Sequence, residues 1–281
     1  VLISTSYPYG QRSLPAFDAQ IPLKSVEVRG EMIDFVGRVK ITQTFINNYP
    51  RNIEAKYLFN LTEDSTVVGM TMQIGDRVLV SHVEEKTEAR ATYETAISEK
   101  KTTCLLEKSA ANGIYTMQVG NILAGQEIKI EIEYLTQLGC SDEGHIRFVL
   151  PTNISPKYDA AQKSIVDMME KRNTMEALKH VSHVPFTFKL ELVWKSNNQI
   201  KEVKSLTNDI SVSGIDDRTV RVVCETAPRN GDFNILVTTD VTPTLYVSQQ
   251  GADSFLMINH RIKDEVLDIE GGEYIILVDR S

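Results

Sequence analysis

Apolar and polar residues alternate along most of this chain with the two-residue period of a β-strand. The clearest example spans residues 126–138. Its apolar positions are Ile128, Ile130, Ile132 and Tyr134, and the charged positions between them are Lys129, Glu131 and Glu133. This alternation is typical of an antiparallel strand with one buried side and one solvent side.

Similar short segments rich in β-branched and aromatic residues recur over residues 21–150 and 186–262. Turn signals separate them, among them Asn47-Asn48-Tyr49-Pro50, Gly75-Asp76 and Ala124-Gly125. Asn, Gly and Pro suit turns because the first two tolerate left-handed geometry and Pro ends a strand ladder. The pattern predicts a mainly β protein with antiparallel sheets, and Trp194 is expected in the core of one alternating strand.

Two segments follow a helical period instead. In residues 84–100, Ala89, Tyr93, Ala96 and Ile97 form a narrow apolar stripe, which we expect to pack on a sheet. Residues 159–183 carry apolar residues at helical spacing, three methionines among them. An adaptable docking surface is one interpretation of the methionines, but packing against the end of a β unit is the usual role of such a stripe.

The last eight residues change character. Residues 274–278 are a continuous apolar run, which is typical of a strand buried in a parallel sheet. Asp279 and Ser281 follow it, and their carboxylate and hydroxyl oxygens suit a hard cation such as Mg²⁺. Because such a cation needs about six oxygen ligands, these two residues form an incomplete metal site with low expected occupancy, and a simple turn is the alternative.

The composition argues against several classes of function. The formal net charge is −8, which argues against non-specific binding to nucleic acid or to anionic membranes. No apolar run approaches the roughly 20 residues of a membrane span. The three cysteines contain no Cys-x-x-Cys pair, so reduced thiols in a cytoplasmic protein are favoured over disulfides. Because the sequence starts at Val1, a signal peptide and a secreted protein remain open.

Four segments, taken in order, resemble one known family. They are residues 84–96 with the Ala89–Tyr93–Ala96 stripe, residues 104–107, residues 119–134 with Gly120, Asn121 and Gly125, and residues 147–158 with Pro151, Pro156 and Tyr158. Together they resemble the vault protein inter-alpha-trypsin (VIT) domain over residues 21–158. The resemblance implies an antiparallel β-sandwich with one packed helix. It also implies a von Willebrand factor A (VWA) domain further along, whose metal-ion-dependent adhesion site (MIDAS) would begin with Asp279 and Ser281.

This resemblance and the local patterns give a fold expectation of a VIT-like antiparallel β-sandwich, a second antiparallel β module, and the first strand of an α/β VWA domain. The expected parts are an N-terminal arm over 1–20, the VIT domain over 21–158, a helical insert over 159–184, the second β module over 185–264, and a truncated VWA start over 265–281. The helical insert departs from the family, so its role is not inherited.

The resemblance implies a non-enzymatic scaffold that binds protein partners, assembles into a larger complex and carries a metal-dependent VWA domain. No catalytic residue or cofactor is expected in this sequence, and Mg²⁺ is expected only with a complete VWA domain; nucleic acid and membrane insertion are not expected. Two alternatives stay open. One is the N-terminal non-catalytic part of a larger enzyme, such as a vault-type ADP-ribosyltransferase. The other is a secreted matrix-binding protein like an inter-alpha-trypsin inhibitor heavy chain.

Overall fold

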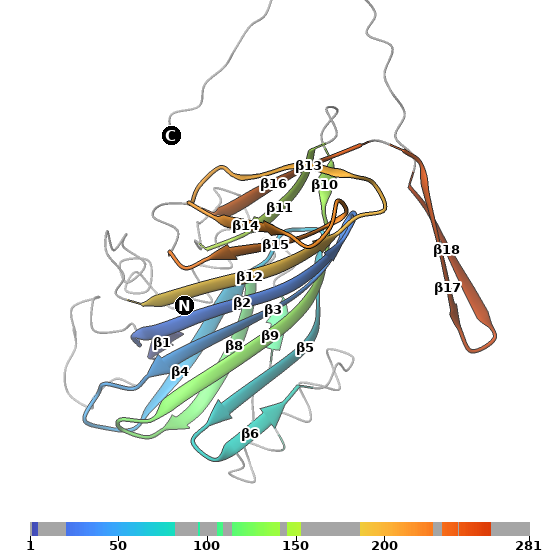
Figure 1. Cartoon of the computed structure of the whole chain (residues 1–281). Coiled ribbons are helices and arrows are strands. Elements are labelled where there is room, and N and C mark those ends of the chain that lie inside the picture. Colours follow the sequence, from blue (N-terminus) through green and yellow to red (C-terminus); the bar gives the residue numbers. More distant parts are fainter. Residues whose placement is uncertain are drawn as a thin grey trace, which may run out of the picture. The chain divides into compact units, whose positions relative to one another are not determined.

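The computed structural model describes residues 2–4, 21–81, 95, 106–108, 114–140, 145–152, 186–226, 232–240 and 242–259. Within these ranges the chain is built almost entirely of β-strands (Figure 1), so the mainly β fold class is confirmed. The helices predicted over 84–100 and 159–183 lie outside the described residues, apart from Thr95, which is helical. No helix in the described part of the chain is long and apolar enough to cross a membrane.

The largest sheet has eight strands in the order β14-β15-β12-β2-β3-β9-β5-β6. The strands are β2 (Leu23–Ile33), β3 (Val36–Ile46), β5 (Ser65–Ile74), β6 (Arg77–Val80), β9 (Glu127–Gln137), β12 (Thr187–Lys195), β14 (Ser211–Gly214) and β15 (Thr219–Cys224). Neighbouring strands run antiparallel except β12 and β2, which pair in parallel from Thr187↔Ser25 to Lys195↔Ile33. This parallel contact joins two segments that lie far apart in the sequence.

Two smaller sheets complete this part of the molecule. One has the order β1-β4-β8-β7, with β1 (Leu2–Ser4), β4 (Ile53–Asn60), β7 (Leu106–Lys108) and β8 (Ile114–Ile122). The other has the order β10-β11-β16-β13, with β10 (Gly139–Cys140), β11 (His145–Leu150), β13 (Ile200–Ser205) and β16 (Phe233–Thr239). Both pack on the large sheet: Tyr57 of β4 contacts Phe45 with ring centroids 6.0 Å apart, and Phe188 of β12 contacts Phe233 at 6.3 Å.

All three sheets bury their apolar side chains in one hydrophobic core. Its largest fully buried members include Trp194, Tyr57, Tyr134, Phe148 and Phe233. The core position of Trp194 is therefore confirmed. The alternation predicted for β9 is confirmed as well, since Ile128, Ile130, Ile132 and Tyr134 are all buried.

Strands of the two expected β modules share sheets as well as this core. β12 pairs with β2, and β16 pairs with β11, so residues 21–158 and 185–240 belong to one compact unit, Val1–Asp240. The sequence suggests two separate units because local periodicity reports no pairing between distant strands. As sequence modules, with boundaries at 158 and 185, the two regions remain a prediction.

A second compact unit spans Val241–Ser281. Its described part is one hairpin of β17 (Thr244–Gln250) and β18 (Asp253–Asn259), connected by a turn in which Gly251 has φ 62°. Glycine suits this position because it carries no Cβ to oppose a positive φ. The hairpin falls in this unit, whereas the sequence analysis includes it in the second β module. Residues 265–281 lie outside the described residues.

Candidate functional site

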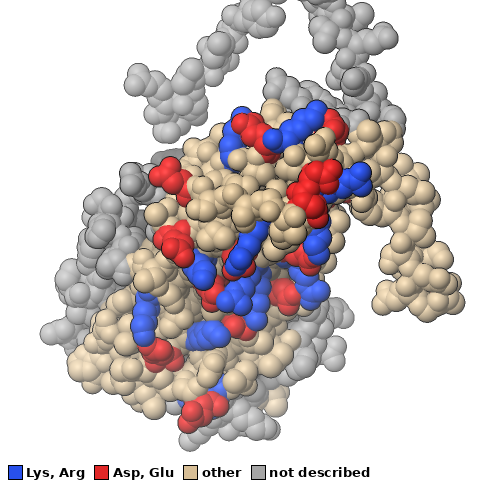
Figure 2. Space-filling model, viewed as in Figure 1, with Lys and Arg blue, Asp and Glu red and all other residues tan. Residues whose placement is uncertain are grey.

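The solvent side of the eight-stranded sheet is the most distinctive surface of the first unit. Val28, Met32 and Val39 are buried on the core side of their strands. Because side chains alternate across a strand, the residues directly before and after each of them point to the solvent side. We call this surface the charged face, and it consists of Glu27, Arg29, Glu31, Arg38, Lys40, Lys129, Glu131, Glu133, Lys189, Glu191, Lys195 and Arg221. Figure 2 shows basic and acidic side chains interleaved over these strands.

Ion pairs connect neighbouring strands across the charged face. Arg38 Nε lies 2.5 Å from Glu133 Oε1 between β3 and β9. Arg221 Nη2 lies 2.6 Å from Glu191 Oε1 between β15 and β12. Lys195 pairs with Glu31 between β12 and β2. In the strand registers these partners are diagonal neighbours rather than directly opposite residues, which long side chains reach easily.

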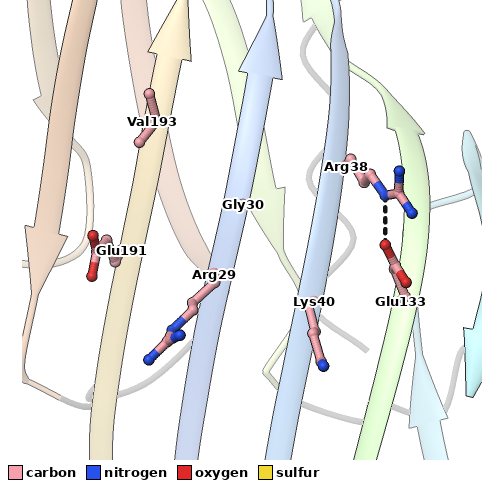
Figure 3. A pocket seen from close by; sticks show the side chains of 7 residues that line it. All are labelled: Arg29, Gly30, Arg38, Lys40, Glu133, Glu191 and Val193. Carbon is pink, nitrogen blue, oxygen red and sulfur yellow. Dashed lines mark hydrogen bonds and ion pairs between the residues drawn. The ribbon is translucent and has the colours of Figure 1, made fainter. Parts of the chain in front are cut away.

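A shallow pocket of about 280 Å³ lies in the middle of the charged face. Strands β12, β2, β3 and β9 line it with Arg29, Gly30, Arg38, Lys40, Glu133, Glu191 and Val193, and the Arg38–Glu133 pair borders it (Figure 3). The pocket therefore combines three cations with two carboxylates.

Gly30 leaves space for a buried side chain of β12 beneath this pocket. A Cβ added at Gly30 would lie 2.8 Å from Leu192 Cδ2 and 3.3 Å from the Arg38 carbonyl oxygen. Real Cβ atoms do not come as close as the shorter of these distances, so a side chain at this position would require the Leu192 side chain to move. Glycine at position 30 thus suits the packing of Leu192, its register partner in β12.

Glu131 is the most strongly perturbed carboxylate on the charged face. Its partial burial acts to raise the pKa, but hydrogen bonds and positive charge from Lys129 and Lys40 outweigh that effect and lower the pKa to about 2. The ammonium groups of Lys129 and Lys40 each lie 2.9 Å from a Glu131 oxygen. Glu131 therefore stays ionised at physiological pH and pairs with both lysines.

The residues predicted to bind metal are not among those the structure describes. Asp279 and Ser281 lie outside the described residues, so the Mg²⁺ site stays a prediction. Elsewhere, in the described ranges, no group of three or more His, Cys, Asp or Glu residues is placed to hold a metal ion. Cys224 is buried and Cys140 is exposed, while Cys104 lies outside the described residues, so the reduced state of the three thiols stays a prediction.

Sequence reasoning did not single out the charged face. The signal was available in β9, where Lys129, Glu131 and Glu133 occupy the outward positions. What the sequence does not contain is the neighbour relation: β12, β2, β3 and β9 become adjacent only through pairings between distant segments.

Comparison with known proteins shows that part of the sequence matches a known domain family. Residues 23–134 match the model of the vault protein inter-alpha-trypsin domain. Human von Willebrand factor A domain-containing protein 5A is 28% identical over 186 residues, which cover 66% of this chain and 23% of that protein. Mouse protein mono-ADP-ribosyltransferase PARP4 is 27% identical over 271 residues, which cover 93% of this chain and 13% of that protein. The matched residues thus cover less than a quarter of either relative.

Among solved structures, an M1 zinc metallopeptidase from Deinococcus radiodurans aligns with 85% of this chain and 47% of its own, with a TM-score of 0.39 and 8% identity. That likeness is too distant to carry a functional argument. The family match is more informative, because its segment contains β2, β3, β5, β6 and most of β9. Strands β12 and β15, which complete the charged face, lie beyond it.

Proposed function

The chain carries a VIT domain over residues 23–134, and from this premise we propose that it is a non-enzymatic scaffold that binds protein partners. The charged face is the observation that carries the proposal. It extends over five adjacent strands, from β15 to β9, and its charges are ordered by ion pairs between strands. Small-molecule sites are usually enclosed pockets of roughly 300–1,000 Å³. The charged face is instead a broad surface with a shallow pocket of about 280 Å³, and it therefore suits a folded partner better than a small molecule.

The charge balance points to the chemistry of that partner. The charged face has seven basic and five acidic side chains, a surplus of two positive charges on a chain whose net charge is −8. Exposed ion pairs contribute only about 0–1 kcal/mol each, so a partner's carboxylates can replace the existing ones at little cost. Complementary charge mainly sets specificity and association rate. We therefore propose an acidic protein surface as the partner.

In a longer protein, this module would precede a VWA domain. Two observations support this: one relative is named von Willebrand factor A domain-containing protein 5A, and residues 274–281 have the expected apolar run and Asp-x-Ser pattern. Asp279 and Ser281 would then supply two oxygen ligands for Mg²⁺, with the other ligands contributed by further residues of that domain. A cytoplasmic location remains part of this proposal.

A second candidate is the N-terminal, non-catalytic part of a larger enzyme. The similarity to mouse PARP4, which is named a mono-ADP-ribosyltransferase, extends over 93% of this chain and favours that candidate. In both cases the described residues would bind and position other proteins. The two candidates differ in whether a transferase domain is present in the complete gene product, which its full sequence would decide.

Two matched charge reversals test the role of the charged face. Arg38→Glu with Lys40→Glu changes the charged face, whereas Lys201→Glu with Lys204→Glu changes two exposed lysines of β13 in another sheet. Proteins that co-purify with the wild type should be lost at least tenfold in the first variant and retained in the second. Equal recovery with both variants, measured by quantitative mass spectrometry at one fixed salt concentration, would contradict the proposal.

A further inference from the structure

The charged face ends in a group of apolar residues beside the turn that connects β2 and β3. We call Ile33, Val36 and Leu135 of β2, β3 and β9 the apolar corner. Ile33 and Leu135 follow the buried Met32 and Tyr134 and therefore point to the solvent side. Val36 is the register partner of Ile33 and a diagonal neighbour of Leu135. The three side chains are 47%, 38% and 40% exposed, respectively, so they form one apolar surface on three adjacent strands.

Two cations lie directly opposite each other in the middle of the charged face. Arg29 and Lys40, which we call the cation pair, are register partners and line the pocket (Figure 3). Like charges in opposite positions destabilise a sheet, so an anion bound between them would relieve the repulsion. Each is paired with one carboxylate, Glu27 or Glu131. Because a guanidinium has five N–H donors and an ammonium has three, the cation pair can bind a further carboxylate.

The spacing of the apolar corner and the cation pair matches that of an α-helix. Val36, Arg38 and Lys40 follow one another on the solvent side of β3, and Arg38 lies opposite Leu135. From Val36 to Lys40 the strand advances about 13 Å. A helix rises 1.5 Å per residue, so side chains at positions i, i+4 and i+7 or i+8 form one stripe of roughly 10–12 Å. A helix along β3 can therefore contact both groups.

We propose that the apolar corner and the cation pair together bind an acidic amphipathic helix of a partner protein, and this proposal rests on the proposed function. Two apolar side chains of the helix, one turn apart, would cover the apolar corner. An Asp or Glu one turn beyond them, in either chain direction, would lie at the cation pair. Helices commonly pack on a sheet, and complementary charge favours one orientation of the partner over others.

The same sheet offers a matched control. Val78 and Val80 of the edge strand β6 are 60% and 59% exposed. Their register partners are Gln73 and Thr71, and Thr71 in turn lies opposite Glu131, which places these residues on the solvent side as well. Apolar side chains there lie opposite uncharged residues. Val78→Ser with Val80→Ser, the edge variant, therefore removes exposed apolar surface without changing the proposed site.

Selection from a displayed library of helical peptides tests the chemistry of the partner. The peptides have about 20 residues, a length at which helices form in water, and one face is randomised. The target is the full chain, and peptides that also bind Ile33→Ser with Leu135→Ser, the corner variant, are removed. Enriched peptides should have apolar residues at i and i+4 and an acidic residue one turn beyond. Enrichment of basic or wholly apolar stripes, or no enrichment, would overturn the proposal.

Fluorescence anisotropy with the best enriched peptide tests the two parts of the site. Binding should weaken at least tenfold in the corner variant and in Arg29→Gln with Lys40→Gln, and should stay within twofold of wild type in the edge variant. Replacing the acidic residue of the peptide by its amide should weaken binding to the wild-type chain at least fivefold, a result that needs no variant to fold. An edge variant as weak as the corner variant, or no effect of the amide, would contradict the proposal.

The proteins that co-purify with the chain separate this proposal from the proposed function. If they are lost in the charge reversal of Arg38 and Lys40 but retained by the corner variant, the scaffold role stands and the helix proposal is wrong. If both variants retain them, the proposed function fails and the helix proposal fails with it. Wild-type dimers in analytical ultracentrifugation that dissociate in the corner variant would make the apolar corner an interface between two copies and would also overturn the helix proposal.

Discussion

Strands β9 and β18 have comparable apolar content but opposite surroundings. The inward residues of β9, such as Ile130 and Ile132, are at most 1% exposed, whereas Leu256 and Ile258 of β18 are 62% and 67% exposed. β9 lies between β3 and β5 and faces the shared core, while β18 has β17 as its one strand partner in the described structure. Alternation therefore tells which side of a strand is apolar, but a second layer decides whether that side is buried.

The outward sides differ as well. β9 has the charged residues Lys129, Glu131 and Glu133 on its outward side. The hairpin has apolar residues on both sides. In the described ranges, the outward side of β9 is therefore mainly charged, whereas both sides of the hairpin carry apolar residues.

Replacing one fully buried side chain should produce the largest effect. Trp194→Ala removes a side chain that is 0% exposed, and truncations of this kind cost about 3–5 kcal/mol because a cavity remains. Leu256→Ala in the hairpin should change the unfolding free energy of the first unit by less than about 0.5 kcal/mol. Urea denaturation followed by circular dichroism measures the unfolding free energy of both variants. Similar losses of unfolding free energy in the two variants would contradict the difference between the buried core and the hairpin.

Replacing a buried polar residue, Asn47, should produce the second largest loss of stability. Asn47 is 0% exposed, and its Nδ2 donates to the carbonyl oxygens of Arg51, Ile122 and Leu123 at 3.0, 3.2 and 2.9 Å. Asn47→Ala should cost about 2–3 kcal/mol, because buried carbonyls lose their donor. Asn48→Ala, at the neighbouring exposed position, should be close to neutral in the same urea titration. A neutral Asn47→Ala would contradict the proposed stabilising role of this turn.

Two buried tyrosines provide a smaller, matched test. The hydroxyl of Tyr57 donates to Gln43 Oε1 at 2.6 Å, across the space between two sheets, whereas the buried hydroxyl of Tyr134 has no hydrogen-bond partner among the described residues. Burial raises the pKa of both phenols, so they remain neutral and donate as O–H groups. Tyr57→Phe should destabilise by about 1 kcal/mol and Tyr134→Phe should not. Thermal unfolding that reverses this order would refute the assignment.

The smallest effect should come from the charged face. Because the folded-state pKa of Glu131 is lowered to about 2 from 4.5, its carboxylate stabilises the fold above about pH 4.5, and this contribution is lost as the pH falls toward 2. At pH 7, Glu131→Gln should cost less than about 1 kcal/mol, since the pairs are partly solvated. The difference from wild type should shrink steadily in denaturation curves recorded from pH 5 to pH 2; a constant difference would exclude this linkage.

Several features of the fold were predictable because they depend on residues that lie close together in the sequence. The outward and inward positions of β9 follow from its alternation, and the turns at Gly75 and Gly125 follow from residue type, with φ of 58° and 73°. The position of Trp194 also follows from its strand pattern. These features depend on neighbours in the sequence, which is the information that periodicity contains.

Other features depend on distant contacts and were not predictable in the same way. The parallel pairing of β12 with β2 joins the expected modules into one unit, and Gly30 reveals its packing role only when Leu192 is placed beside it. The charged face follows from this pairing, so the sequence indicated its individual charges but not their arrangement. The predicted ligands Asp279 and Ser281 remain for experiment.

Native-state hydrogen exchange tests most directly the central claim, that the VIT strands and the later strands form one cooperative unit carrying one continuous charged face. Amides of Val28 in β2 and Leu190 in β12, which are register partners in the core, should exchange only through a common opening. With increasing denaturant, their opening free energies should converge on one line. If Leu190 exchanges through an independent opening of lower free energy, with Val28 still protected, the two regions are separate units and the account is wrong.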